Sequence, residues 1–377
     1  MSTMIDFRRE LHRHPELSFE EHDTQRFILA ALSEAGIECR SIAGTGVLAR
    51  IEGRRGNLNR GVVLRADIDA LPIKELNDVD FRSEREGVMH ACGHDMHAAM
   101  LYGVLMELNR ERDFEGTLFG IFQPGEELNP GGASLVLKEK PFEGYDIAAV
   151  IGQHVDARLE VGEVGICPGE FMAANDELRL YVSGRGGHAA RRGDIDDSVT
   201  AMCDMVISTT ALNAPKCVVS VGRIIADGAT NVIPDRVSAE GTIRTFDEEE
   251  RERLHTLIRG NARRVEERYG VQVEVDINRG YPSVVNDVML SYEAMIIAAD
   301  EGVAVRELQP IPMAEDFGYY TRLYPSLFYR LGVGAASGGS HTATFLPSEE
   351  ALEVGRRVMQ RLALHILNKE TNTDKDS

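Results

Sequence analysis

The strongest constraint on the fold of this chain is a set of short apolar runs. Each run is followed by carboxylate or imidazole side chains, which are costly to bury. Each run has the length and composition of a buried strand. The runs are residues 62–64 before Asp67 and Asp69, residues 118–122 before Glu126 and Glu127, and residues 148–151 before His154. A helical pattern over residues 95–109 separates the first two runs. Strands that alternate with helices predict an α/β fold, in which helices cover a largely parallel sheet.

The polar ends of these runs also predict where a functional site lies. In open α/β sheets, the ligand crevice is found at the carboxyl ends of the strands. Residues far apart in the sequence, such as Asp69, Glu126 and His154, are therefore expected to meet at one edge of the sheet.

A second domain is predicted after residue 170, where apolar and polar residues begin to alternate. Strand-like alternation is found at residues 178–182, 217–224, 236–245 and 271–277, and helical patterns are found at residues 197–212 and 247–269. The resulting β-α-β-β-α-β order is that of a ferredoxin-like α+β domain. We expect this domain to span residues 171–280, inserted into a discontinuous first domain formed by residues 1–170 and 281–377.

The charge and cysteine content of the 377-residue chain exclude several classes of function. Asp and Glu number 61 against 41 Lys and Arg, a formal net charge of −20, so binding of nucleic acid or an anionic membrane is not expected. No apolar run approaches the ~20 residues of a spanning helix, and the first residues lack the apolar core of a secretory signal. Five widely spaced cysteines do not form a disulfide framework, which predicts a reducing, cytoplasmic setting. The polar segment at residues 369–377 is expected to fray.

The segment from residue 89 to 97 carries the densest chemistry, with one thiol, three imidazoles and a carboxylate. Cys92 and His94 are two residues apart, so in extended backbone both side chains can reach one ion. A thiolate and an imidazole suit Zn²⁺ or a similar cation, in a catalytic or a closed structural site. The alternative is a polar loop with a packed cysteine. His90 and His97 are expected to pack or to act behind the ligands.

The adjacent carboxylates Glu126 and Glu127 are the second element of the site. Such a pair repels itself unless a cation or a proton separates the two charges. One carboxylate can bind metal while its neighbour acts as a general base, the division that metal-assisted hydrolysis requires. The alternative is a solvated loop, but Pro124-Gly125 and Gly131-Gly132 favour a positioned one.

Two isolated histidines complete the candidate ligands. His154 ends a buried strand, where a histidine is more often a packed or capping residue, and His341 follows two glycines that permit a close backbone approach. Each is weak evidence alone. Taken together, one cysteine, three histidines and one glutamate, with two aspartates nearby, fit a two-metal site.

Other motifs in the chain do not support alternative cofactors. Residues 44–49 match G-x-G-x-x-A, but a dinucleotide site needs a helix after the glycines, and here residues 47–51 read as a strand. The glycine-rich turn at residues 184–188 lacks the lysine and hydroxyl of a phosphate loop, and the chain has no G-x-S-x-G elbow. A nicotinamide-dependent oxidoreductase is therefore not favoured.

Several longer motifs, in order, resemble one known family. They are Leu11-His12-Arg13-His14-Pro15-Glu16-Leu17, Leu64-Arg65-Ala66-Asp67-Ile68-Asp69-Ala70-Leu71-Pro72, His90-Ala91-Cys92-Gly93-His94-Asp95-Met96-His97, Phe122-Gln123-Pro124-Gly125-Glu126-Glu127, Gly186-Gly187-His188-Ala189-Ala190 and Asn231-Val232-Ile233-Pro234-Asp235. With these motifs the chain resembles the M20 metallopeptidase family over about residues 5–367. The resemblance is to its amidohydrolase subgroup, which includes aminoacylases, hippurate hydrolases and N-acetyl-diaminopimelate deacetylases.

This resemblance implies a role for each matching residue. The metal ligands, for two Zn²⁺ or Mn²⁺ ions with Ni²⁺ or Co²⁺ as alternatives, would be Cys92, His94, Glu127, His154 and His341. Glu126 would be the general base, and Asp69 would orient one of the metal-binding side chains without contacting the metal itself. His188, on the inserted domain, would reach the reacting carbonyl when that domain closes, and in dimeric relatives it serves the neighbouring subunit. Asn231 and Arg244 would hold a substrate carboxylate.

The resemblance therefore implies a metal-dependent amidohydrolase that cleaves an N-acyl amino acid, a small molecule, into a carboxylate and a free amino acid. The inserted domain would be a lid or dimerisation domain, and its sheet could pair edge to edge in a homodimer. Two departures leave the substrate open: Arg191-Arg192 replaces the usual Pro-His, and Thr342 follows His341. The alternatives are a dipeptidase or aminopeptidase of the same superfamily and a catalytically idle binding protein on the same fold.

Overall fold

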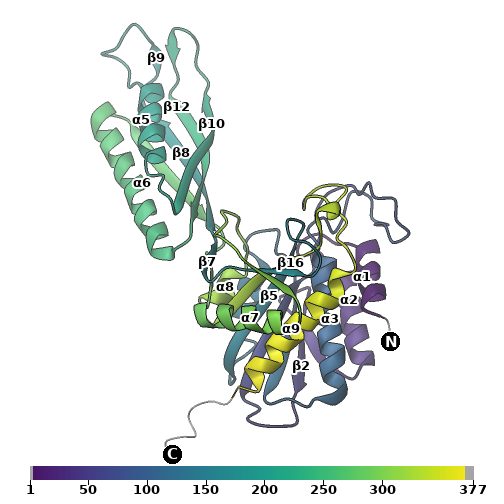
Figure 1. Cartoon of the computed structure of the whole chain (residues 1–377). Coiled ribbons are helices and arrows are strands. Elements are labelled where there is room, and N and C mark those ends of the chain that lie inside the picture. The colour runs from purple at the N-terminus through teal and green to yellow at the C-terminus, as the bar shows by residue number, and fades with distance from the viewer. Residues whose placement is uncertain (1–2, 370–377) are drawn as a thin grey trace, which may run out of the picture. The chain divides into compact units, whose positions relative to one another are not determined.

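The computed structural model describes residues 3–369, so residues 370–377 of the polar tail lie outside the described residues (Figure 1). The chain folds as two compact units. Unit 1 comprises residues 3–169, 285–309 and 319–369, and unit 2 comprises residues 170–284 and 310–318. The sequence placed residues 310–318 in the first domain. They belong to unit 2 because the backbone amide of Ala173 donates to Met313 O and that of Ile311 donates to Phe171 O.

Unit 1 is built on a mixed, mostly parallel sheet in the strand order β1-β2-β4-β3-β5-β16-β6-β15. Its strands are β1 (Glu38–Ile42), β2 (Gly46–Glu52), β3 (Arg60–Asp67), β4 (Thr117–Gln123), β5 (Asp146–Asp156), β6 (Glu163–Ile166), β15 (Ala304–Glu307) and β16 (Ser326–Gly332). The central strands β4, β3, β5 and β16 run parallel to one another, whereas β1 and β2 form an antiparallel hairpin. The predicted parallel sheet is confirmed at its centre, but the short β1–β2 turn can join only antiparallel strands.

The register of the parallel strands brings the polar ends together. Asp67 at the end of β3 pairs with Gln123 at the end of β4, and Arg65 pairs with Gly152 of β5. The segments that carry Asp69, Glu126 and His154 therefore leave the sheet at the same edge. The G-x-G-x-x-A sequence begins in the β1–β2 turn, and its last four residues form the start of β2 rather than a helix, which excludes a dinucleotide fingerprint there.

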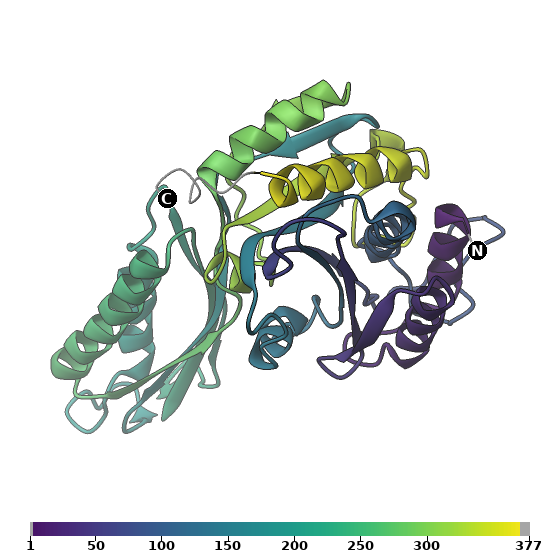
Figure 2. The same ribbon diagram turned by 90° about the horizontal axis from the view of Figure 1, so that it is seen from below.

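Helices cover the sheet of unit 1, and α3 is the one that positions the site. The helices are α1 (Met4–Arg13), α2 (His22–Glu34), α3 (His94–Glu111), α4 (Gly132–Lys138), α7 (Val288–Asp300), α8 (Gly318–Thr321), the 3-10 turn η1 (Ala335–Ser337) and α9 (Ala351–Leu367). The first two turns of α3 are buried on all sides because α1, α9 and the sheet pack around it, with α9 drawn in yellow in Figure 2. Within residues 3–369, no helix is both long and apolar enough to cross a membrane.

Unit 2 has its own sheet and core. Its elements are β8 (Ala174–Ser183), β9 (Gly187–His188), α5 (Ser198–Thr210), β10 (Cys217–Ala226), β11 (Val232–Ile233), β12 (Arg236–Thr245), α6 (Glu248–Tyr269) and β13 (Gln272–Arg279), and β7 (Gly169–Met172) and β14 (Val284–Asn286) lie at its borders. The strands β10-β12-β8-β13 form an antiparallel sheet in that order, and α5 and α6 pack against it around a core that includes Leu180, Met205 and Leu254. Apart from the two-residue strands, the chain order is strand-helix-strand-strand-helix-strand.

Candidate metal centre

The segment Cys92-Gly93-His94 forms the turn that starts α3 and delivers two of the predicted ligands. Gly93 has a left-handed backbone with φ 92°, and a Cβ atom there would lie 2.5 Å from Val155 Cγ2. Only glycine fits both conditions, so the turn brings the Cys92 and His94 side chains against the end of β5.

Asp69, two residues beyond β3, holds two of the ligand segments in place. Its Oδ1 and its backbone O accept from His94 Nδ1 at 3.1 and 2.9 Å, and its Oδ2 accepts from the backbone amide of Glu127 at 2.9 Å. The Ser18 hydroxyl donates to the same Oδ2 at 2.7 Å. Although burial opposes it, these donors lower the pKa of Asp69. Asp69 therefore remains a carboxylate that orients its neighbours.

The carboxylate pair Glu126-Glu127 lies in a tight loop after β4. Gly125 has φ 60°, and a Cβ atom on Gly132 would lie 1.7 Å from the backbone oxygen of Pro124. The loop closes through the Gly132 amide, which donates to Gly125 O at 3.0 Å. Glu126 is only 7% exposed, so the solvated-loop alternative does not apply to it.

The last two histidines come from opposite sides of the Cys92 turn. His154 lies near the end of β5 and is buried, and its Nδ1 donates to the backbone oxygen of Val155 at 2.7 Å. His341 lies in the loop after η1, where its backbone amide donates to Ala91 O at 2.8 Å. This bond ties a segment 249 residues away to the Cys92 turn.

The structure brings all five predicted ligands together. Cys92 Sγ lies 3.3 Å from His154 Nε2 and 3.3 Å from His341 Nε2, and Glu127 Oε1 lies 3.2 Å from His341 Nε2 and 4.0 Å from His94 Nε2. The donor atoms fall into compact groups within 4.8 Å of one another, and these groups are Cys92-His94-His154, Cys92-Glu127-His341 and His94-Glu126-Glu127. Cys92 belongs to two of the groups, and the predicted base Glu126 lies in the third.

The chemistry of these donors fits divalent cations. His94 Nδ1 donates to Asp69, so in the neutral ring Nε2 carries a lone pair, and this buried atom has no hydrogen-bond partner among the described residues. Burial raises the pKa of the Cys92 thiol to about 12, so a nearby cation is needed to ionise it. Although burial opposes it, the charge of Asp67 raises the pKa of His94 well above its usual value, so a cation that binds at Nε2 would displace a proton from this ring. An unpaired imidazole nitrogen, a thiol and carboxylates at one point are the donor set of a borderline-soft cation.

The predicted catalytic residue His188 and the predicted substrate-binding residues Asn231 and Arg244 lie in unit 2. His188 on β9 pairs with Val232 of β11, and the amide of Ala189 donates to Asn231 O at 2.9 Å, so His188 and Asn231 are neighbours. The segment that carries Asn231 leads into the end of β12 at which Arg236 pairs with Ser183. Arg244 lies eight residues further along β12. At ~3.3 Å per residue, that places Arg244 about 26 Å from the His188 end of the sheet.

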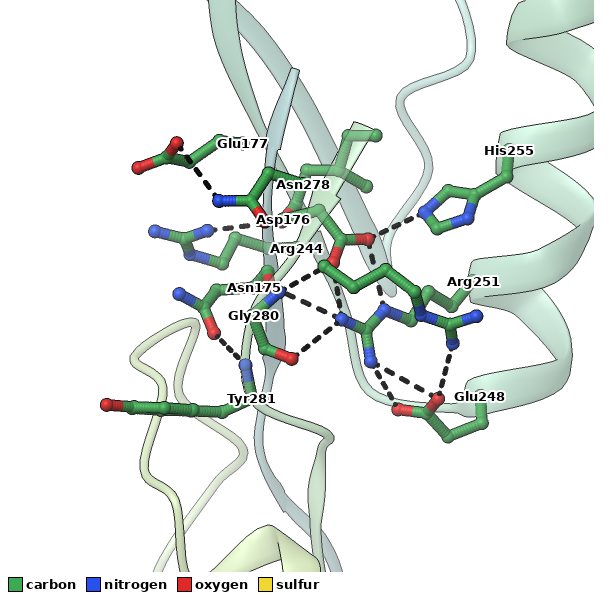
Figure 3. Close-up of polar contacts among 12 residues, drawn as sticks. Asn175, Asp176, Glu177, Arg244, Glu248, Arg251, His255, Asn278, Gly280 and Tyr281 are labelled. Atoms are coloured by element: carbon green, nitrogen blue, oxygen red, sulfur yellow. Dashed lines mark hydrogen bonds and ion pairs between the residues drawn. The ribbon is translucent and has the colours of Figure 1, made fainter. Parts of the chain in front are cut away.

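Arg244 borders a buried cluster of charged residues (Figure 3). Asp176 lies between Arg251 and His255 of α6, with its Oδ2 3.0 Å from Arg251 Nε and 2.6 Å from His255 Nε2. Arg244 itself donates to the Thr242 hydroxyl at 2.5 Å and forms no ion pair with any carboxylate among residues 3–369. The charge of its half-buried guanidinium is therefore not neutralised by an ion pair with any carboxylate of the described residues.

Two residues near the site were not identified as functional from the sequence. Ser18 lies within a loop and carries no local signal for its bond to Asp69. His97 is expected to pack or to act behind the ligands, and its Nδ1 lies 2.5 Å from Asp67 Oδ1. Its spacing of three residues from His94 puts both on one face of α3, a signal that could have placed it near the site but not specified its partners.

Comparisons with known proteins agree with this geometry. Residues 63–365 match peptidase family M20/M25/M40. The chain is 37% identical to N-acetylcysteine deacetylase of Bacillus subtilis over 97% of both chains, and 35% identical to N-acetyldiaminopimelate deacetylase of Anoxybacillus flavithermus over 95% of this chain and 96% of that one. A solved structure of the YXEP protein of Bacillus subtilis, described as a dinuclear metal binding peptidase of the M20 family, has a TM-score of 0.86, 35% identity and 97% coverage of both chains. The resemblance predicted from the motifs is confirmed: this chain belongs to peptidase family M20/M25/M40 and is a hydrolytic enzyme that acts on amide bonds.

Proposed function

We propose that the chain removes the acetyl group from an N-acetyl amino acid, by metal-dependent hydrolysis of the amide bond with Glu126 as general base. The observation that carries the proposal is the gathering of five metal-type donors with the buried carboxylate of Glu126, which directly precedes the donor Glu127. The two relatives named as deacetylases, each matching nearly the whole chain, support the acetyl group and the amino-acid class of the substrate.

The ligands of two divalent cations would be Cys92, His94, Glu127, His154 and His341. Cys92, His94 and Glu127 each belong to at least two of the compact donor groups. Zn²⁺ or Mn²⁺ suits this set, with Ni²⁺ and Co²⁺ as alternatives. When bound, such cations polarise a carbonyl and lower the pKa of water. The similar YXEP protein of Bacillus subtilis, described as a dinuclear metal binding peptidase, supports a number of two cations.

The protein groups supply the proton transfers and the orientation. Glu126 takes a proton from the attacking water and passes it to the leaving amine, which then departs as the free amino acid. Asp69 keeps the proton of His94 on Nδ1 and thereby directs Nε2 toward the cations. Because Glu126 is buried, its carboxylate is not screened by bulk water and stays close to the reacting groups.

Unit 2 would be a ferredoxin-like lid and dimerisation domain. Arg244, free of ion pairs, would bind the substrate carboxylate, and His188 with Asn231 would act on the reacting carbonyl and the substrate. A small N-acetyl amino acid cannot span the ~26 Å between the two ends of β12. A homodimer would resolve this, because the partner's copy of His188 could serve the site. The edge strand β10, with Ile224 and Ile225 exposed, would form the contact.

The test replaces Glu126 with Gln and compares an N-acetyl amino acid with the matching dipeptide as substrate. We expect kcat/KM for the N-acetyl substrate to fall ~10²–10⁴-fold, with zinc content unchanged. The matched control is Glu143→Gln, an exposed glutamate outside the site, which should leave both quantities unchanged. Near-normal turnover by the Glu126 variant would refute the role of the base, and preference of the wild type for the dipeptide would refute the deacetylase assignment.

A further inference from the structure

The peptide groups of Val155 occupy an unusual position between two histidines. Pairing of β3 with β5 ends at Arg65 and Gly152, so the amide of Val155 has no partner in β3. It donates instead to His97 Nε2 at 3.0 Å, while the carbonyl of the same residue accepts from His154 Nδ1 at 2.7 Å. All of these groups are buried.

These two bonds determine which ring nitrogen of each histidine carries its proton. A backbone amide can only donate, so His97 Nε2 must hold a lone pair and Nδ1 must hold the proton. A backbone carbonyl can only accept, so His154 Nδ1 must hold the proton and Nε2 a lone pair. The free nitrogen of His154 faces Cys92 Sγ at 3.3 Å.

A buried ion pair anchors the far side of His97. Its Nδ1 donates to Asp67 Oδ1 at 2.5 Å, and Arg65 Nη1 donates to Asp67 Oδ2 at 2.6 Å. Arg65 and Asp67 are fully buried and lie on β3, at the centre of the sheet. Since the ion pair is rigidly held, the ring of His97 has a fixed position relative to the sheet.

We propose that His97 is a positioning residue for the metal centre, which holds the Val155 backbone so that His154 Nε2 is aimed at Cys92 Sγ. The inference rests on the proposed function, because it assumes that His154 and Cys92 share a cation. The proposal also means that His97 is not itself a metal ligand. Although His97 belongs to a compact group with Asp67 and His94, both of its ring nitrogens are already used within the protein.

Two amide variants of His97 separate this positioning role from simple packing. In His97→Gln the side-chain oxygen lies near the place of Nε2 and can still accept from Val155, whereas in His97→Asn the amide lies near the place of Nδ1 and keeps only the bond to Asp67. We expect the Asn variant to bind the weaker of two Zn²⁺ ions ~10–100-fold less tightly than the wild type. The Gln variant should stay near the wild-type affinity.

Zn²⁺ affinities would be measured by competition with a chelator on the full chain, and circular dichroism would verify the fold of each variant. His365→Asn and His365→Gln are the controls, since His365 is an exposed histidine on α9 that belongs to none of the donor groups of the site. Both should leave the affinities unchanged. Wild-type affinity for both ions in His97→Asn, or equal losses in the two His97 variants, would overturn the proposal.

A measurement on the wild type covers the case in which a His97 variant does not fold. Nitrogen-15 NMR of the cation-free protein should show neutral His97 with its proton on Nδ1, and a proton on Nε2 would overturn the inference. The proposed function fails separately. If the wild type binds no Zn²⁺, the two-cation centre is wrong, whatever the tautomer of His97.

Discussion

Gly93 offers a sharp test of how the Cys92 turn is held, because two separate constraints act on the same residue. Its φ of 92° lies in the left-handed region, and a Cβ atom would lie 2.5 Å from Val155 Cγ2. Substitution of Gly93 with Ala therefore strains the backbone and also pushes against the strand that carries His154. We expect both the stability of unit 1 and its affinity for Zn²⁺ to fall.

The two contributions can be estimated and separated with a second glycine. A left-handed backbone costs an alanine about 1–2 kcal/mol, and forcing an extra carbon into a packed interior costs about 1–3 kcal/mol. Gly87 has φ 77° and no atom within 4 Å of its added Cβ, so Gly87→Ala carries the first cost alone. The difference between the two variants is then the steric cost, about 1–3 kcal/mol.

The assay is scanning calorimetry of the cation-free variants, followed by Zn²⁺ titration. At ~2–4 °C per kcal/mol for a unit of this size, Gly93→Ala should melt about 2–12 °C below Gly87→Ala. Gly87→Ala should bind Zn²⁺ as the wild type does, because its added carbon meets no atom within 4 Å. Equal melting temperatures for the two variants would show that Val155 yields to the added carbon, and the argument from close contact would be refuted.

Three further predictions concern the buried polar groups. Asp176→Asn should destabilise unit 2 by about 3–5 kcal/mol in urea denaturation, because Arg251 loses its buried partner, whereas the exposed Asp276→Asn should change stability by less than ~1 kcal/mol. Burial opposes ionisation of Asp176, but the hydrogen bonds from His255 and Arg251 lower its pKa below the ordinary value. The stability that Asp176 contributes is therefore present above pH ~4 and is lost as the pH falls further. Acid titration of the wild type and of Asp176→Asn measures this loss. Ser18→Ala removes a bond to the Asp69 carboxylate and should lower stability by about 1.5–3 kcal/mol in the same urea assay, and an unchanged midpoint would contradict it.

The sequence predicts the parts of the fold that depend on local pattern. The helices predicted at residues 95–109 and 247–269 lie at His94–Glu111 and Glu248–Tyr269 in the structure, because their apolar spacing is encoded locally. For the second helix, Asp247 also caps the start and Gly270 ends it. The strands before Asp67, Glu126 and His154 are confirmed for the same reason. Contacts with distant segments decide the rest: residues 310–318 join unit 2 through backbone bonds that leave no trace in their own composition.

The same division explains which site residues could be predicted. The Cys92-His94 pair and the Glu126-Glu127 pair can be recognised as candidate ligands from the chemistry of their own segments, whereas His154 is weak evidence alone. The parallel register explains why the segments after β3, β4 and β5 meet. His341 does not belong to these strands, and its loop is held by backbone bonds to distant segments, such as those from His341 N to Ala91 O and from Leu76 N to Ala343 O, which no sequence pattern encodes.

The pairing of His97 with Val155 is harder to predict, because it arises from a difference in length between two strands. β5 extends beyond the last residue of β3 that pairs with it, and the amide left without a strand partner needs an acceptor in a buried place. An imidazole held by a buried carboxylate provides that acceptor, and the same residue's carbonyl then directs a second imidazole toward the thiol. The precision of the metal centre therefore depends on where the strand pairing ends, a property of the assembled sheet that belongs to no single segment.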